Sequence, residues 1–367
     1  MTKLLAINFG GIGDEILFLP TLRTIRECNP DWHLTLLLEP RSRSVIQVTD
    51  LVDAVLTFDI KQKPLYVSHL LDLLGLLREG GFDVVVSSGG SALVAMLLFL
   101  SGISQRVGYD SSAIARELLT RTVPLERNQY AACMYHDLTA GLGISRAAEF
   151  PRASVPADAS QRMQAFLKEA GLSARAESAT VLIHPGTSQL AIQKGIIKTW
   201  SANSWSRLID SLSEISNVTT IVSGGPDDKE TVSEILTLCK PGQVINAYGH
   251  TRSLADLAAL IQLTDVLVCV DSAPMHLGVA LGKPLVALFG PTDEKKLLPE
   301  DQRFRALRGS GTRPDENVFK SPSGCRARSA QTVPGSGVQL QPETVCQAVR
   351  DQLYLASGRG SFQECGR

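Results

Sequence analysis

Short apolar runs alternate with segments of helical periodicity along most of the chain. The run at residues 4–9 predicts a strand, and the apolar spacing within residues 16–25 predicts a helix after it. The same half contains further predicted strands at 33–38, 54–58 and 84–87, and a helix at 70–77. Strands that alternate with helices indicate a parallel sheet with right-handed crossovers. An uninterrupted apolar strand such as 84–86 indicates that both faces of this sheet are covered.

The pattern weakens between residues 145 and 160, where Pro151 and Pro156 lie among small and charged residues. It restarts with predicted strands at 180–183, 218–222, 244–246, 266–270 and 285–289, and helices at 203–215, 229–238, 254–263 and 274–281. We therefore predict an α/β protein with two doubly wound domains, residues 1–150 and 161–340, joined by a linker at 151–160.

The C-terminal part of the chain departs from this rhythm. Gly, Ser, Pro and Arg dominate residues 303–337, which predicts a loop without regular structure. We expect a last helix at 341–356 that packs back on the N-terminal domain. The tail at 357–367 is expected to be disordered.

Composition and charge narrow the possible functions. The 367 residues include 36 Lys and Arg against 37 Asp and Glu, so a dedicated nucleic-acid binder, which needs a basic surplus, is disfavoured. The most apolar run, residues 92–100, is too short to span a bilayer and predicts a buried or at most interfacial helix. The N-terminus resembles a first strand rather than a signal peptide. Seven scattered cysteines without a Cys-x-x-Cys pair predict neither a disulfide framework nor a zinc site, and they fit a cytoplasmic protein.

A glycine-rich turn follows the first predicted strand. Gly11 and Gly13 allow tight turning, and the N-terminus of the next helix favours an anion. One interpretation is the dinucleotide fingerprint of NAD-dependent oxidoreductases, with Glu39 on the ribose, but Ile16 occupies the position of the third glycine. Asp14 is either a first-turn acid that stabilises the helix or a general base that takes a proton from an acceptor hydroxyl.

Three loops in the second half carry polar residues suited to a phosphate or a sugar: Thr187 with Ser188, Lys198 or its competitor Lys194, and Gly225 with Asp227. The first loop wraps an anion or forms a simple turn. A lysine would neutralise charge on a diphosphate leaving group. Asp227 suits ribose hydroxyls, and its pairing with Asp228 alone is poor evidence for a metal.

The most informative segment begins with Asp271 at the end of a predicted strand and opens a helix. Ser272 and His276 are four residues apart and therefore share one face of that helix. Pro274 suits the first helical turn. A hydroxyl, free N–H groups and an imidazole then converge where a phosphate would bind, although His276 alone would also suit a core histidine.

In this order and approximate spacing, the motifs resemble glycosyltransferase family 9, the ADP-heptose:lipopolysaccharide heptosyltransferases. The resemblance covers about residues 3–295 and rests on Gly11-Ile12-Gly13-Asp14, His184-Pro185-Gly186-Thr187, Lys198-Thr199-Trp200, Gly224-Gly225-Pro226-Asp227, Asp271-Ser272 with His276, and Gly290-Pro291-Thr292.

The resemblance implies a GT-B fold of two Rossmann-like domains facing a central cleft, with the acceptor on the first and the nucleotide sugar on the second. It implies inverting transfer of a heptose from an ADP-sugar to a lipopolysaccharide-type acceptor, without metal or cofactor. Asp14 is then the candidate base. The candidate donor-binding residues are Gly11, Gly13, Thr187, Ser188, Lys198, Gly225, Asp227, Asp271, Ser272 and His276.

Arg41, Arg43 and Arg106 fall in the expected acceptor domain. They are solvated surface residues or bind carboxylate or phosphate groups of an anionic glycolipid. A lipid-linked acceptor implies peripheral association with the inner face of the cytoplasmic membrane. Three alternatives remain: a related transferase with another nucleotide sugar and a polysaccharide or protein acceptor, an NAD-dependent oxidoreductase, and a non-catalytic nucleotide-sugar sensor.

Overall fold

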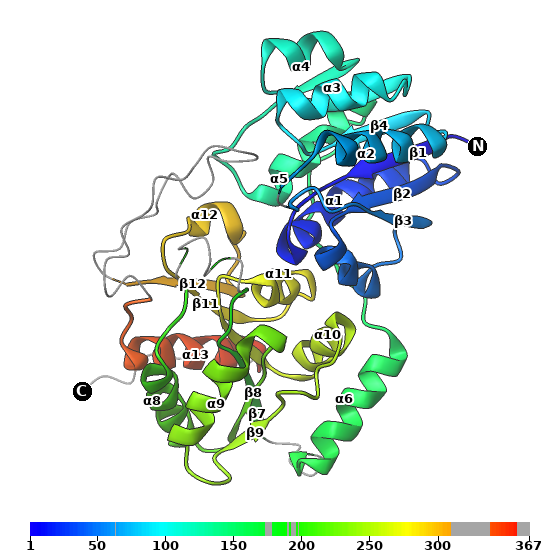
Figure 1. Cartoon of the computed structure of the whole chain (residues 1–367). Coiled ribbons are helices and arrows are strands. Elements are labelled where there is room, and N and C mark those ends of the chain that lie inside the picture. The colour runs from blue at the N-terminus through cyan, green and yellow to red at the C-terminus, as the bar shows by residue number, and fades with distance from the viewer. Residues whose placement is uncertain are drawn as a thin grey trace. The chain divides into compact units, whose positions relative to one another are not determined.

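The computed structural model describes residues 1–62, 64–172, 178–188, 191, 196, 198–309 and 338–357. The chain folds into two compact units, drawn in Figure 1. The first comprises Met1–Ser154, and the second begins at Val155 and contains most of the remaining chain.

The first unit is a parallel six-stranded sheet with helices on both faces (Figure 1). The strand order is β3-β2-β1-β4-β5-β6, and Leu4 of β1 pairs with Leu34 of β2 and Val84 of β4. The strands are β1 (Lys3–Ile7), β2 (His33–Leu38), β3 (Ala54–Thr57), β4 (Val84–Ser87), β5 (Gln105–Asp110) and β6 (Arg121–Pro124). The helices are α1 (Ile12–Cys28), η1 (Pro40–Val48), α2 (Val67–Glu79), α3 (Ala92–Leu100), α4 (Ala113–Leu118), α5 (Ala131–His136) and η2 (Asp137–Leu142).

The second unit repeats this topology with other elements. Its parallel strands have the order β12-β11-β10-β7-β8-β9. Read from β9, and with β7 taken as the first strand, this is the same order as in the first unit. The strands are β7 (Ala179–His184), β8 (Val218–Val222), β9 (Val244–Asn246), β10 (Val266–Val270), β11 (Leu285–Phe289) and β12 (Phe304–Arg308). The helices along this part of the chain are α6 (Ala157–Glu169), α8 (Ala202–Ser213), η4 (Pro226–Asp228), α9 (Lys229–Leu238), α10 (Leu254–Leu263), α11 (Ala273–Ala280), α12 (Glu294–Leu297) and α13 (Pro342–Ala356).

Local sequence explains where several helices begin. Ser91, Ser201 and Ser253 precede α3, α8 and α10, and each hydroxyl accepts the backbone N–H three residues later. Fully buried apolar strands such as β10 and β11 form the centre of the second unit, as expected for a sheet covered on both faces. The prediction of two doubly wound α/β domains is confirmed.

The expectation for the last helix is wrong. We expected residues 341–356 to pack on the N-terminal domain, whereas α13 packs against α8 and the strands β10, β11 and β12 of the second unit. Val345 and Val349 on α13 are fully buried in the same core as Trp205 of α8. The apolar face of α13 is therefore used within the second unit.

Two other boundaries differ from the sequence predictions. The expected linker at 151–160 is shorter, because the second unit begins at Val155 and α6 at Ala157. The region at 303–337 begins with the strand β12, which lies at the edge of its sheet and alternates buried Phe304 with exposed Arg305. Its charged positions concealed the strand. The rest of that region and most of the tail lie outside the described residues.

The apolar helix α3 is only partly buried. Its inner residues Ala95, Leu97 and Leu98 lie in the core, whereas Met96 and Phe99 are 43% and 49% exposed. None of the helices in the described part of the chain is long and apolar enough to cross a bilayer.

Candidate functional site

In open α/β sheets, ligands bind beyond the carboxyl ends of the strands where the strand order reverses. In the first unit this point lies between β1 and β4. The Ser88 hydroxyl after β4 donates to Asn8 Oδ1 after β1 at 2.6 Å, and the Asn8 amide donates to the backbone carbonyl of Asp14 at 3.3 Å. This chain of bonds fixes both loops and the first turn of α1.

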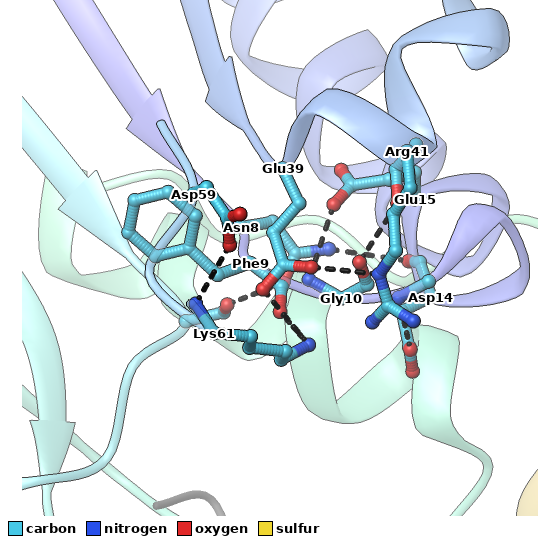
Figure 2. A network of polar contacts seen from close by, with 12 residues as sticks. Asn8, Phe9, Gly10, Asp14, Glu15, Glu39, Arg41, Asp59 and Lys61 are labelled. Atoms are coloured by element: carbon cyan, nitrogen blue, oxygen red, sulfur yellow. Dashed lines mark hydrogen bonds and ion pairs between the residues drawn. The ribbon is translucent and has the colours of Figure 1, made fainter. Parts of the chain in front are cut away.

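Asp14 lies in the first turn of α1, and both of its carboxylate oxygens have donors. The Gly11 N–H donates to Oδ2 at 2.8 Å, and the Tyr135 hydroxyl from α5 donates to Oδ1 at 3.3 Å. A Cβ on Gly10 would lie 2.2 Å from the Asp14 Cβ, so only glycine fits there. Asp14 therefore acts as a capping acid of this turn (Figure 2), and its side chain is partly exposed.

Glu15 is the buried neighbour of Asp14. Its Oε1 accepts the Gly10 N–H at 3.3 Å, and Oε2 has no hydrogen-bond partner among the described residues. Burial, and then the negative charge of Asp14, raise the pKa of Glu15 well above its usual value. The N–H of Gly10 is thus bound by the buried Glu15, and the N–H of Gly11 by the partly exposed Asp14.

Glu39, at the end of β2, organises two cations beside this turn. Arg41 Nε lies 2.7 Å from one carboxylate oxygen and Lys61 Nζ lies 3.1 Å from the other, while Glu39 itself is 2% exposed (Figure 2). Lys61 Nζ also donates to the Phe9 carbonyl at 2.7 Å. Because both Glu39 oxygens face cations, the carboxylate does not present itself to a ribose, which disfavours the NAD alternative. The role of Lys61 could not be predicted from the sequence, since lysines in polar loops are normally solvated.

The three predicted acceptor arginines do not lie together. Arg41 and Arg43 follow β2 at the carboxyl edge of the sheet, and both are exposed. Arg106 is the second residue of β5 and therefore lies toward the opposite edge. Its guanidinium donates to the Leu118 carbonyl at 3.0 Å and covers the Phe99 ring. The grouping of Arg106 with Arg41 and Arg43 is therefore wrong. In a parallel sheet the start of one strand and the end of another lie at opposite edges, so Arg106 is far from the other two.

In the second unit the strand order reverses between β7 and β10. Asp271, directly after β10, is 2% exposed and pairs with Lys198 Nζ at 2.7 Å. Burial raises the pKa of Asp271, but the charges of Lys198 and His276 outweigh burial and hold the pKa below its usual value. Lys198, Asp271 and the buried His276 thus form one electrostatic group, as their sequence order suggested. Lys194 lies outside the described residues.

Ser272 is the N-cap residue of α11, yet its hydroxyl makes no capping bond and donates instead to the Val270 carbonyl at 3.3 Å. Thr187, after β7, is buried, and Ser188 beside it is exposed and accepts the Ala191 N–H at 3.3 Å. The β7 and β10 loops therefore offer polar side chains at the strand-order reversal of this unit.

The loop after β8 contains Gly225, Asp227 and Asp228. Asp227, the residue predicted for the ribose, is exposed, whereas Asp228 is 5% exposed and accepts the Gly225 N–H at 2.8 Å. Burial, and then the Asp227 charge, raise the pKa of Asp228 to about 6. Its carboxylate also lies 3.9 Å from the buried His184 at the end of β7. Asp228 is a structural acid beneath the exposed Asp227.

The described residues contain no group of three or more His, Cys, Asp or Glu side chains that could hold a metal ion. His184 lies beside Asp228, but these residues do not form such a group with Asp227. Besides these acids, the carboxyl ends of the two sheets carry side-chain cations, hydroxyls and helix N-termini, which suit an anionic substrate.

Comparison with known proteins agrees with this chemistry. The family model of glycosyltransferase family 9 (heptosyltransferase) matches residues 71–322. The chain belongs to this family. It is therefore a glycosyltransferase with the GT-B fold, built from two Rossmann-like doubly wound domains.

Individual relatives are similar over most of their length. The chain is 28% identical to lipopolysaccharide heptosyltransferase 3 of Escherichia coli, over 77% of this chain and 81% of the relative. The structure of Escherichia coli ADP-heptose lipopolysaccharide heptosyltransferase II superposes with a TM-score of 0.72 at 20% identity, over 97% of this chain and all of that one. A further Escherichia coli heptosyltransferase, solved with ADP-2-deoxy-2-fluoro heptose, gives a TM-score of 0.64 at 21% identity, over 84% of this chain and 94% of that one.

Proposed function

We propose that this transferase moves a heptose from ADP-L-glycero-D-manno-heptose to a lipopolysaccharide-type acceptor, with inversion and without a metal or cofactor. The names of the relatives support the sugar and the acceptor, since one is a lipopolysaccharide heptosyltransferase and another was solved with an ADP-heptose analogue. The observation that carries the chemistry is Asp14, a partly exposed carboxylate fixed at the carboxyl end of β1.

Asp14 acts as the general base in this proposal. It accepts the proton of the acceptor hydroxyl while that oxygen bonds to the anomeric carbon, and the bond from this carbon to the diphosphate breaks in the same step. The electron pair of the broken bond leaves with ADP. A single in-line displacement of this kind inverts the anomeric centre.

The donor is held by the second unit. Lys198, which Asp271 fixes at 2.7 Å, and the N-terminus of α11 at Ser272 supply positive potential for the diphosphate in place of a metal ion. We assign exposed Asp227 to the ribose. The remaining proposed donor contacts are Thr187, Ser188, Gly225 and His276, together with Gly11 and Gly13, which leave room for the sugar.

The acceptor is anionic in this proposal, and the first unit supplies the matching charge. Arg41 and Lys61 are held in place by the buried Glu39, so less side-chain entropy is lost when they bind phosphate or carboxylate groups. Exposed Arg43 adds a third cation on the same side of β2.

A lipid-linked acceptor would bring the enzyme to the inner face of the cytoplasmic membrane. Exposed apolar side chains of α2 and α3 support peripheral contact with lipid, among them Val67, Leu71, Met96 and Phe99. Sedimentation with lipid vesicles tests this point. The double variant with Met96→Ser and Phe99→Ser should show a smaller bound fraction of protein. An unchanged bound fraction would contradict the proposed contact with lipid.

The direct test is ADP release from ADP-heptose with inner-core-truncated lipopolysaccharide as acceptor. We expect equal turnover in excess EDTA and in magnesium, and a product of inverted anomeric configuration. In thermal-shift measurements ADP should stabilise the protein more than UDP or GDP. Activity that EDTA abolishes and magnesium restores would contradict the metal-free mechanism, and equal nucleotide shifts would contradict the ADP assignment.

A further inference from the structure

Tyr135 connects α5 to the proposed base, although 121 residues separate it from Asp14 in sequence. Its hydroxyl lies 3.3 Å from Asp14 Oδ1, and its ring packs edge-on against Phe18 of α1 with the ring centroids 5.8 Å apart. The contact therefore has an apolar part, which α1 and α5 share, and a polar part, which reaches only the carboxylate.

The direction of this hydrogen bond is settled by charge. Burial, and then the negative charge of Asp14, raise the pKa of the Tyr135 hydroxyl well above its usual value. The titratable groups that face it are Asp14 and Glu15 from α1 and Tyr109 from β5, none of which is cationic. The hydroxyl thus keeps its proton and donates it to Asp14 Oδ1.

Asp14 consequently has one fixed donor on each oxygen, the Tyr135 hydroxyl on Oδ1 and the Gly11 N–H on Oδ2. Two donors from different elements determine the plane of a carboxylate, whereas the Gly11 bond alone would leave rotation about the Cβ–Cγ bond possible. Each oxygen retains a lone pair for a substrate proton.

Building on the proposed role of Asp14, we propose that Tyr135 is a positioning residue for the transfer reaction, because its hydroxyl orients the Asp14 carboxylate toward the acceptor hydroxyl. It touches neither substrate and acts through Asp14. Removal of the hydroxyl releases one oxygen of the base and also removes a donor that favours the charged carboxylate.

The test is Tyr135→Phe in the full chain, which keeps the ring on Phe18 and removes only the hydroxyl. With ADP-heptose and inner-core-truncated lipopolysaccharide, kcat should fall by about 10-fold or more while the KM for ADP-heptose is unchanged.

Tyr109→Phe is the matched control. The Tyr109 hydroxyl donates to the Met134 carbonyl, directly before Tyr135, at 2.8 Å and does not bond to Asp14. This variant also removes a tyrosine hydroxyl that bonds at α5, so its kcat and its KM for ADP-heptose should match those of the wild type. A loss equal to that of Tyr135→Phe would assign both effects to the packing of α5 and overturn the proposal.

Asp14→Asn separates this proposal from the proposed function. If Asp14→Asn is inactive and Tyr135→Phe has wild-type kcat, the positioning role alone is wrong. If Asp14→Asn is active, the base assignment itself is wrong. The kcat losses of Tyr135→Phe and Asp14→Asn should be less than additive in the double variant, whereas Tyr109→Phe should leave the kcat of Asp14→Asn unchanged.

Discussion

Each unit contains the same short turn, two glycines followed by an acid that accepts the N–H of the second glycine. Gly11 donates to Asp14 at 2.8 Å in the first unit, and Gly225 donates to Asp228 at 2.8 Å in the second. The two acids differ in what covers them. Asp228 is 5% exposed under the β7 loop, where a Cβ on Gly186 would lie 1.8 Å from its Oδ1, whereas Asp14 is partly open. The same local geometry thus leaves one acid partly exposed, as the proposed base must be, and buries the other.

The largest expected difference between the two turns is catalytic. Asp14→Asn keeps the size and capping oxygen of the side chain and removes its charge, so kcat should fall by about 10²–10⁴ with little change in Tm. Asp228→Asn makes the same chemical change in the other turn and should reduce kcat by less than about 10-fold. The rate of ADP release at saturating concentrations of both substrates measures kcat for both variants. An Asp14→Asn variant that retains more than about a tenth of wild-type kcat would show that Asp14 is only a helix cap.

The paired lysines extend the comparison to stability. Lys198 is 16% exposed and neutralises Asp271, which is itself 2% exposed, so Lys198→Ala would leave a buried charge without its partner. We expect the free energy of unfolding to fall by about 3 kcal/mol. Lys61 is 42% exposed, and in Lys61→Ala the Glu39 carboxylate still pairs with Arg41. This variant should therefore lower the free energy of unfolding by about 1 kcal/mol or less. Urea unfolding of the two variants measures the difference, and equal losses would contradict it.

Much of this arrangement could be predicted because it follows from strand ends. The apolar runs of β1, β7 and β10 are unambiguous, and in a parallel sheet the loops after them meet at one edge. That rule placed Asp14 and Asp271 correctly beyond their strands. We predicted no strand at β5, which begins with polar residues, so the rule could not place Arg106.

Contacts that depend on a third element were beyond prediction. Lys61 reaches Glu39 only because the loop after β3 turns back over β1, and Tyr135 reaches Asp14 only because α5 packs on α1. Asp227 and Asp228 are adjacent and chemically identical in sequence. Burial by the β7 loop distinguishes them, and no local pattern reports it.

The buried carboxyl of Asp228 should also make the stability of the protein depend on pH. Burial raises the pKa of Asp228 from its ordinary value of 3.8 to about 6. Between these values the folded protein binds a proton that the unfolded chain has lost, so this group's contribution to stability falls as pH rises through about 4 to 6. The Tm of Asp228→Asn minus that of the wild type should therefore increase by about 3–6 °C from pH 4 to pH 7. A difference that does not change with pH would show that Asp228 is ionised throughout.

The smallest expected effect separates the two edges of the first sheet. Arg41 and Arg43 lie at the carboxyl edge with Asp14, so Arg41→Ala with Arg43→Ala should raise the acceptor KM by about 5- to 20-fold and leave ADP affinity unchanged. Arg106 is the control, because it lies toward the other edge of the sheet. Its guanidinium donates to the Leu118 carbonyl there and lies over the Phe99 ring. Arg106→Ala should therefore lower the free energy of unfolding by about 1 kcal/mol and leave the acceptor KM unchanged. Steady-state kinetics with varied acceptor, together with urea unfolding, measure both quantities. A raised acceptor KM in Arg106→Ala alone would reverse the assignment and place the acceptor's anionic groups away from the carboxyl edge.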